Sequence, residues 1–448
     1  MVKLNILIIS HSFPPYMNVG GLRAYSWAKY WSELGHNITV MTSKNRGEFS
    51  YTSIFKIDMP ENIEIIEIDN PLYKYFGINK NPTTTNQPVK KNLYKKILER
   101  CFMFIKNNVP VVDYYFDWSI KCISYIKKHK DKFNKFDFVI TTANPLSAHQ
   151  IGLYLKKNMG LKWIADYRDL EEQSEIKKEI GKLRKMLIQK YKEKVISNAD
   201  LNVTVSEGLK EILLSYNSEV PVKVIYNGYF EENYEETTEK SLKWQITYTG
   251  TFYKDEFVIK PLFEALQSLD SATIPIPPIH FYGIGDKEIE NFIINQAGVT
   301  LKDFIFFHSS CSNKEIANVQ KSSSILLLMD GLNNKGVLKT KSYEYLAAQR
   351  PIIAIINKES ELAKKFLANK SGYCVSTNSD DIKKFIERVY LARQESKPFN
   401  SLSFYEPDKL IYYSRRTQAI ILLDYIIKNT LRREKYEEGM YFSSSSPL

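Results

Sequence analysis

Short apolar runs alternate along the chain with longer segments in which apolar residues recur every three or four positions. The short runs predict buried parallel strands and the longer segments predict amphipathic helices, so the pattern indicates successive βαβ units. The predicted strands are Leu4–Ile9, Ile38–Thr42, Ile63–Ile68, Phe136–Thr141, Lys162–Ala165, Leu201–Val205, Val222–Tyr226, Gln245–Thr249, Ile279–Tyr282, Phe304–Phe307, Ile325–Met329, Ile352–Ile356 and Tyr373–Val375. We therefore predict an α/β protein built from two doubly wound, Rossmann-like halves.

The alternation breaks at an acidic and polar stretch, "YFEENYEETTEKSLK", which has little to bury. We interpret this stretch, residues 229–243, as a linker between an N-terminal domain (1–228) and a C-terminal domain (244–405). The helical pattern over 406–435 either completes the second domain or crosses back to the first. The tail, 436–448, ends in "SSSSPL" and is expected to be disordered.

An insert over residues 70–135 holds no clear strand. Its segment "KKNLYKKILERCFMFIKN" places apolar residues on one helical face and crowds lysines around the rest. A basic amphipathic helix of this kind either lies in a membrane interface or packs on the domain with a solvated basic back. Both interpretations stay open at this stage.

The positive charge is confined to one half of the chain. Residues 1–230 hold 34 Lys and Arg against 23 Asp and Glu, so this half carries the whole net charge of +11. The asymmetry favours an anionic partner such as a membrane surface or a lipid-linked phosphate, although nucleic acid or a merely soluble basic surface would also fit. The four cysteines lie far apart, which favours a reduced compartment such as the cytoplasm, and no apolar run is long enough to span a bilayer.

A glycine pair follows the first predicted strand. The stretch "SHSFPPYMNVGGLR" lacks the G-x-G-x-x-G spacing that wraps a dinucleotide, which argues against an NAD enzyme. Gly20 and Gly21 can instead present backbone N–H groups to a phosphate at the N-terminus of the helix that follows. We predict that they form the first domain's half of an interdomain phosphate clamp.

Six segments in a fixed order resemble the GT-B-fold glycosyltransferases of the group-1, or family-4, kind. They are the first βαβ segment, "GLKWIADYRDL", "ADLNVTVSEGL" with "VKVIYNGY", "ITYTGTFY", "IHFYGIG" and "KTKSYEYLAAQRPIIAI". The "WIADYRDL" and "KSYEYLA" segments are similar to a bacterial polysaccharide-assembly branch of that family. The resemblance implies two Rossmann-like domains facing across a cleft, a nucleotide-sugar donor and transfer with retention.

The donor site is expected in the second half. A carboxylate can accept hydrogen bonds from two ribose hydroxyls, and Glu344 lies near the start of a predicted helix whose dipole also favours phosphate. Lys341 lies three positions earlier, on nearly the same face, and can reach a diphosphate. The alternative is an ordinary surface Lys–Glu pair. Gly283 and Gly285 allow a tight strand-to-helix turn near the nucleotide or simply a plain turn.

The chain departs from the family pattern at two positions. Family members commonly carry a first glutamate eight positions before the second, but Gly336 stands there. The usual strand-end arginine is also absent, because Thr251 follows Gly250. We expect Lys254 or Lys260 to bind the diphosphate instead, since a flexible ammonium reaches phosphate from a different backbone position. We interpret the missing glutamate as a changed sugar pocket.

The first half offers candidate catalytic residues. Asp166, Arg168 and Asp169 end a predicted strand and either contact the substrate or form a structural ion-pair network. His149 follows "TTANPLSA" and either hydrogen bonds to the donor sugar, transfers a proton or is structural, and His11 is comparable.

No D-x-D occurs, so we expect no metal and no other cofactor, with the diphosphate charge neutralised by lysine, arginine and helix N-termini. No convincing nucleophile is present, which favours same-face attack guided by the leaving phosphate.

We predict that the protein transfers a hexosyl or N-acetylhexosaminyl group from a UDP-sugar to a lipid-linked or polymer glycan acceptor. The product would be capsule, O-antigen or lipopolysaccharide. The enzyme is expected to be cytoplasmic and peripheral at the inner membrane surface, with no nucleic acid as partner. The alternatives are a nucleotide-sugar epimerase or other two-Rossmann enzyme, and a catalytically decayed basic binding protein.

Overall fold

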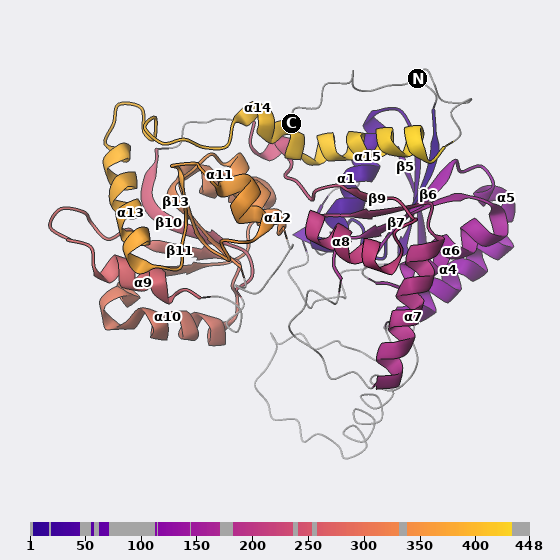
Figure 1. Cartoon of the computed structure of the whole chain (residues 1–448), viewed down its shortest axis with the longest axis horizontal. Helices are drawn as coiled ribbons and strands as arrows, with labels where there is room; N and C mark the ends of the chain where they lie inside the picture. The colour runs from indigo at the N-terminus through magenta and orange to yellow at the C-terminus, as the bar shows by residue number, and fades with distance from the viewer. Residues whose placement is uncertain are drawn as a thin grey trace, which may run out of the picture. The chain divides into compact units, whose positions relative to one another are not determined.

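The computed structural model describes residues 3–17, 19–44, 55–57, 62–70, 113, 115–143, 145–170, 182–235, 241–252, 258–330 and 338–431. This part of the chain divides into two compact units, each with its own sheet (Figure 1). The first unit holds the described residues up to Val205, Leu209–Ile225 and those from Ala419 onward. The second unit holds Ser206–Gly208 and Tyr226–Gln418. The predicted basic helix in the insert and the predicted tail lie outside the described residues.

The first unit is built on a seven-stranded parallel sheet of order β5-β3-β1-β6-β7-β8-β9. Its strands are β1 Asn5–Ile9, β3 Asn37–Ser43, β5 Ile63–Ile68, β6 Phe138–Thr142, β7 Lys162–Tyr167, β8 Leu201–Thr204 and β9 Val222–Val224. Each corresponds to a strand predicted from an apolar run. A two-residue antiparallel pair, β2 Tyr16–Met17 with β4 Phe55–Lys56, was not predicted.

Helices cover both faces of this sheet because successive strand residues point to opposite sides. One face packs Trp163 of β7 and Leu7 of β1 against Trp118 and Ile151 of the neighbouring helices. On the other face, the Trp31 ring lies edge-on to Phe138 at 6.1 Å, and its indole donates to the Ala419 carbonyl oxygen at 2.8 Å. The helices are α1 Leu22–Glu33, α4 Phe116–Lys128, α5 Lys130–Phe133, α6 Ala148–Met159, α7 Lys182–Asn198, α8 Glu207–Tyr216 and α15 Arg415–Asn429, the last two of which start in the second unit.

The second unit is built on a six-stranded parallel sheet of order β12-β11-β10-β13-β14-β15. Its strands are β10 Lys243–Thr249, β11 Ile279–Tyr282, β12 Ile305–His308, β13 Ser323–Met329, β14 Ile352–Ile355 and β15 Tyr373–Val375. Its helices are α9 Lys260–Gln267, α10 Lys287–Leu301, α11 Asn313–Ser322, α12 Thr340–Ala347, α13 Ser379–Arg393 and α14 Pro407–Leu410, with a π-helical turn at Leu362–Leu367. Together the two sheets confirm the predicted α/β class.

The alternation along β10 divides this unit into two faces. Ile246 and Tyr248 point into the hydrophobic core formed with α9, α10 and α13. Thr247 and Thr249 point to the opposite face, where they meet hydroxyl and amide groups: Thr247 bonds to Ser323 at 2.8 Å and Thr249 accepts from Gln320 of α11 at 3.2 Å. The polar face therefore leads to the carboxyl end of β10, where the candidate donor-site residues lie.

No helix among the described residues is long and apolar enough to cross a bilayer.

Candidate functional site

Two glycines shape the carboxyl edge of the second sheet. Gly250 ends β10 with φ +105° and Gly283 ends β11 with φ +86°, a region that residues with a side chain rarely adopt. A Cβ atom built on Gly283 would lie 3.9 Å from the Cα of Gly250, so the two turns run close together. Their amides bond back into the sheet, Gly250 N to Tyr282 O at 2.9 Å and Gly283 N to His308 O at 3.1 Å. This tight edge is where a nucleotide approaches an open parallel sheet.

Lys341, in the first turn of α12, lies directly over this edge. Its Nζ is 3.7 Å from the position of a Gly250 Cβ, donates to the Tyr248 hydroxyl at 2.7 Å and lies 4.2 Å above the Tyr248 ring. Burial and, secondarily, the neighbouring Lys339 ammonium lower the pKa of Lys341 to about 7, against the opposing effects of Asp330 and Glu344. The structure thus brings together Lys341 and Gly250, which lie 91 positions apart in the sequence.

Glu344, one helical turn after Lys341, lies in a mixed polar setting. Burial raises the pKa of its carboxyl group, and the Arg415 and Lys341 cations and a hydrogen bond from Gln320 act in the opposite direction. Gln320 also donates to the Thr249 hydroxyl, which ties this group to the end of β10. Glu344 and Lys341 therefore present a carboxylate and an ammonium at the same sheet edge.

The other predicted donor-site residues fall on the same edge or outside the described residues. Gly285 has φ +63°, and Asp286, which follows it, caps α10 by accepting from Glu288 N at 2.8 Å. The Thr251 carbonyl accepts from the Tyr248 hydroxyl at 2.6 Å. Lys260 begins α9, is exposed and lies 3.6 Å from Glu264. Lys254 and Gly336 lie outside the described part of the chain, so their predicted roles stay predictions.

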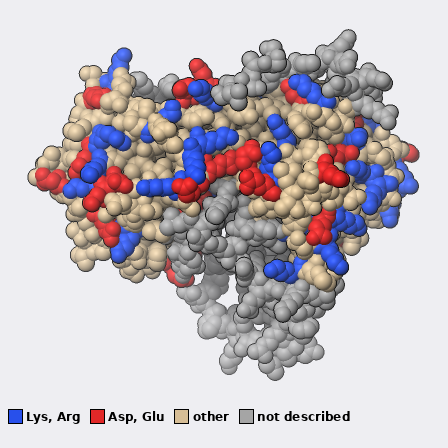
Figure 2. Space-filling view, viewed as in Figure 1, with Lys and Arg blue, Asp and Glu red and all other residues tan. Residues whose placement is uncertain are grey.

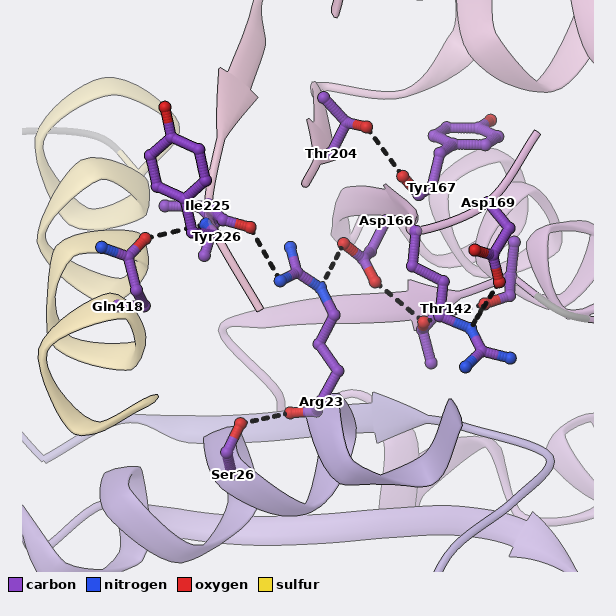
Figure 3. A network of polar contacts seen from close by, with 12 residues as sticks. Arg23, Ser26, Thr142, Asp166, Tyr167, Asp169, Thr204, Ile225, Tyr226 and Gln418 are labelled. Carbon is purple, nitrogen blue, oxygen red and sulfur yellow. Dashed lines mark hydrogen bonds and ion pairs between the residues drawn. The ribbon is translucent and has the colours of Figure 1, made fainter. Parts of the chain in front are cut away.

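The Asp166 carboxylate is the centre of a buried network in the first unit (Figure 3). Arg23 Nε of α1 lies 2.9 Å from Asp166 Oδ1, and the Thr142 hydroxyl donates to Oδ2 at 2.8 Å. Arg23 Nη1 donates to the Ile225 carbonyl oxygen at 2.8 Å. Burial raises the pKa of Asp166, against the effects of Arg23 and Thr142. The network joins α1 to the ends of β6, β7 and β9. Such a network favours the interpretation in which Asp166 forms a structural ion pair.

Arg168 lies at the edge of the same network, next to the first glycine loop. Its Nε donates to the Ala143 carbonyl oxygen at 3.0 Å and lies 3.7 Å from Asp169. A Cβ on Gly20 would lie 1.9 Å from Arg168 Nη1, so only glycine lets the guanidinium approach this closely. Gly21 follows as the N-cap of α1, without a side-chain cap. The predicted glycine pair and the predicted arginine thus meet at the N-terminus of α1.

His149 is completely buried in the first unit. Its Nδ1 lies 2.7 Å from the Thr141 hydroxyl, which also accepts from the Trp163 indole at 2.8 Å, and its ring lies 4.4 Å from that of Tyr167. Burial lowers the pKa of His149 to about 3, so the imidazole is neutral. This setting favours a structural histidine, and the predicted contact with a sugar stays a prediction.

Sequence reasoning did not identify the partners of the candidate residues. Arg23 is the charge partner of Asp166, and Tyr248 supports Lys341. Gln320 and Arg415 act on Glu344. The signal for Arg23 was its position two residues after the glycine pair in "GGLR", at the start of a helix. The other contacts join segments far apart in the chain and left no local signal.

Residues 95–232 match the family model for Glycosyltransferase Family 4. The matched segment contains β6, β7 and β8 with the Asp166 and Arg168 residues. Over this segment, which is less than a third of the chain, the sequence is similar to the family-4 glycosyltransferases. The two parallel sheets with their helices form two Rossmann-like units. No curated protein matches the chain in sequence.

Solved structures share this fold across nearly the whole chain. Sucrose-phosphate synthase from Thermosynechococcus elongatus is similar with a TM-score of 0.58 and 12% identity, covering 94% of this chain and 96% of that one. TarM is similar with a TM-score of 0.55 and 12% identity, covering 98% of both. WaaG, a glycosyltransferase involved in lipopolysaccharide biosynthesis, is similar with a TM-score of 0.51 and 13% identity, covering 85% and 90%. At these identities the likeness establishes the GT-B fold.

Proposed function

We propose that this enzyme transfers a hexosyl or N-acetylhexosaminyl group from a UDP-sugar, with retention, to a lipid-linked or polymer glycan in cell-surface polysaccharide assembly. The observation that carries the proposal is the Lys341 ammonium over the Gly250 turn, with the Glu344 carboxylate one helical turn away. A nucleotide sugar presents a diphosphate and a ribose, which need a cation and a hydrogen-bond acceptor at this spacing.

In this assignment Lys341 binds the donor diphosphate. It takes the role of the family's strand-end arginine, whose position is occupied by Thr251 in this chain. The N-terminus of α12, where Lys339 occupies the N-cap without a side-chain cap, adds a favourable dipole for the same anion. Glu344 accepts hydrogen bonds from the ribose hydroxyls. HepE from Anabaena, solved in complex with UDP-glucose, shares the fold with a TM-score of 0.50 and 11% identity over 94% of both chains, which supports a UDP-sugar donor.

The chemical step needs no metal in this proposal. The bond between the anomeric carbon and the diphosphate oxygen breaks, and the acceptor oxygen attacks the anomeric carbon from the same face. The acceptor proton passes to the leaving phosphate oxygen. Lys341 and the α12 dipole stabilise the negative charge that develops on the diphosphate, which is the part of the reaction that a bound metal would otherwise assist.

Basic groups of the first unit support an anionic acceptor. Arg168 lies over Gly20 at the N-terminus of α1, where guanidinium and backbone N–H groups favour a phosphate. Lysines also gather on the end of this unit that carries α4 to α6 (Figure 2). The exposed ones are Lys121, Lys127, Lys128, Lys130, Lys135 and Lys157. We propose that this lysine face meets the anionic inner surface of the cytoplasmic membrane.

Flotation with vesicles tests the membrane contact. Vesicles that contain anionic lipid should carry the protein upward and neutral vesicles should not. Reversing the charge at Lys127 and Lys128 should weaken flotation, whereas reversing it at Lys287 and Lys302, exposed lysines of the second unit, should not. Equal flotation of the two double variants would contradict the assignment of this face.

Calorimetric titration of the purified full chain with a panel of nucleotide sugars tests the donor. At least one UDP-sugar should bind saturably, and Lys341→Ala should weaken binding while Lys287→Ala, at an 88% exposed side chain, should not. Release of UDP should require an acceptor. Interconversion of the donor sugar without an acceptor would indicate an epimerase instead. Binding to duplex nucleic acid that falls with salt, without any binding of nucleotide sugars, would indicate a basic binding protein.

A further inference from the structure

The segment over residues 229–235, near the start of the long stretch Tyr226–Gln418 of the second unit, is held against α11. The Tyr234 hydroxyl donates to Gln320 Oε1 at 2.6 Å, and Lys321 Nζ donates to the Tyr234 carbonyl oxygen at 2.9 Å. Glu231–Asn233 forms a 3₁₀ turn just before it. The sequence predicted a linker here because the stretch is acidic and polar. The described part of this linker instead makes specific contacts with a helix that borders the candidate donor site.

The Gln320 amide lies between the Tyr234 hydroxyl on one side and Thr249 and Glu344 on the other. Because Oε1 accepts from Tyr234, Nε2 is turned toward the Thr249 hydroxyl, 3.2 Å away, and toward the Glu344 carboxylate. Gln320 is completely buried, and an amide turned the other way would present its oxygen to the Glu344 carboxylate, which can only accept, and would lose that bond. The nearby Glu344 in turn contributes to a raised pKa at Tyr234, after the larger effect of burial.

A second residue of the same segment supports the opposite side of Glu344. The Phe230 ring lies 4.8 Å below the Arg415 guanidinium, and Arg415 N donates to the Tyr229 carbonyl oxygen at 2.8 Å. Arg415 is the largest contributor to keeping the Glu344 carboxyl ionised. Residues 229–235 therefore reach Glu344 by two routes, through Gln320 and through Arg415.

We propose that Tyr234 is a positioning residue for nucleotide recognition: through Gln320 it orients the Glu344 carboxylate to accept from both ribose hydroxyls. The inference rests on the proposed function, since it assumes that Glu344 binds the ribose of a uridine nucleotide. It assigns to the segment predicted as a linker a part in choosing ribonucleotides over deoxyribonucleotides. Tyr234 touches no substrate in this scheme and acts through Gln320.

The test compares calorimetric binding of UDP and 2′-deoxyuridine diphosphate to the full chain. The wild type should prefer UDP by about 10- to 100-fold, as expected for a hydrogen bond to a charged acceptor. Tyr234→Phe removes only the hydroxyl and should reduce the preference to about threefold, with little change in affinity for the deoxy nucleotide. Tyr229→Phe, in the same segment, is the matched control and should keep the full preference. In a Glu344→Gln background, Tyr234→Phe should have no further effect.

The outcomes separate the two proposals. If the wild type binds UDP with a preference that Glu344→Gln removes but Tyr234→Phe leaves intact, the positioning role is wrong and the proposed function stands. Equal weakening of both nucleotides by Tyr234→Phe would also overturn it, because that result indicates a purely structural tyrosine. If the wild type binds neither nucleotide, the proposed donor itself is wrong.

Discussion

Donor binding should take up a proton at Lys341. The pKa of this lysine is lowered to about 7 in the free protein, so near neutral pH about half of the molecules carry an uncharged amine over Gly250. A bound diphosphate favours the ammonium and raises the pKa. Because the pKa is higher in the complex, binding must become weaker as pH rises through the free value, and it should be independent of pH well below it.

The size of the effect follows from the free pKa. With a pKa of about 7 in the free protein and a value well above 8 in the complex, affinity for a UDP-sugar should fall roughly tenfold between pH 6 and pH 8, or about 1.4 kcal/mol. The proton taken up per donor should be about one half at pH 7 and about nine tenths at pH 8. A UDP-sugar is used rather than UDP because a terminal phosphate titrates near pH 6 and would add its own dependence.

Calorimetry in buffers of different ionisation enthalpy measures this proton uptake directly. Lys341→Arg is the matched variant, because a guanidinium stays charged throughout this range. It should bind the donor with little pH dependence and no proton uptake, while Lys341→Met should bind weakly at every pH. A wild type that binds without proton uptake, or an arginine variant with the same pH profile as the wild type, would refute the assignment of Lys341 to the diphosphate.

Three further predictions concern the first unit. Gly152→Ala should destabilise the first unit by about 1–3 kcal/mol, because the new Cβ would lie 2.1 Å from Nε1 of the buried Trp163. This loss should outweigh the better helix propensity of alanine. Urea unfolding followed by tryptophan fluorescence measures the change in stability. Asp166→Ala should cost about 3–5 kcal/mol in the same assay, because it leaves the Arg23 charge buried without its carboxylate, and a change under 1 kcal/mol would contradict a structural ion pair. Gly20→Ala should push the flexible Arg168 guanidinium aside with little loss of stability but weaker transfer to the acceptor, and unchanged transfer kinetics would show that this contact is not used.

The strands were predictable because burial on both faces leaves a local signature. A parallel strand such as β13, whose seven residues are all buried, must be an uninterrupted apolar or small run, and the sequence shows it as one. The ends were less certain, because strand ends carry polar residues chosen for other contacts. β7 continues through Asp166 and Tyr167, beyond the predicted end at Ala165, since the carboxylate is neutralised by Arg23 within the fold.

The sequence singled out the residues of the candidate site but not the partners that they have in the fold. Glu344 and Lys341 stood out because they share a helical face near an N-terminus, a local relation. The Arg23–Asp166 pair spans 143 positions and the Tyr234–Gln320 pair spans 86, so only the folded topology reveals them. The contacts of the predicted linker were missed for the same reason. Its composition showed little to bury, whereas its tyrosine hydroxyl and phenylalanine ring have partners far away in the sequence.

In the proposed function, Lys341 takes the place at the diphosphate that the absent strand-end arginine would hold. An arginine after Gly250 would reach a phosphate from the strand, whereas Lys341 reaches the same turn from α12, with the Tyr248 ring beneath its ammonium. A guanidinium stays charged when partly buried, but an ammonium in that place loses its proton more readily, as its lowered pKa indicates. The proposed function therefore has, in place of a permanently charged phosphate ligand, a lysine that is fully charged only when the anion is present. An enzyme built in this way should hold its product diphosphate less tightly as pH rises, so at high pH its turnover should be limited by donor binding rather than by product release.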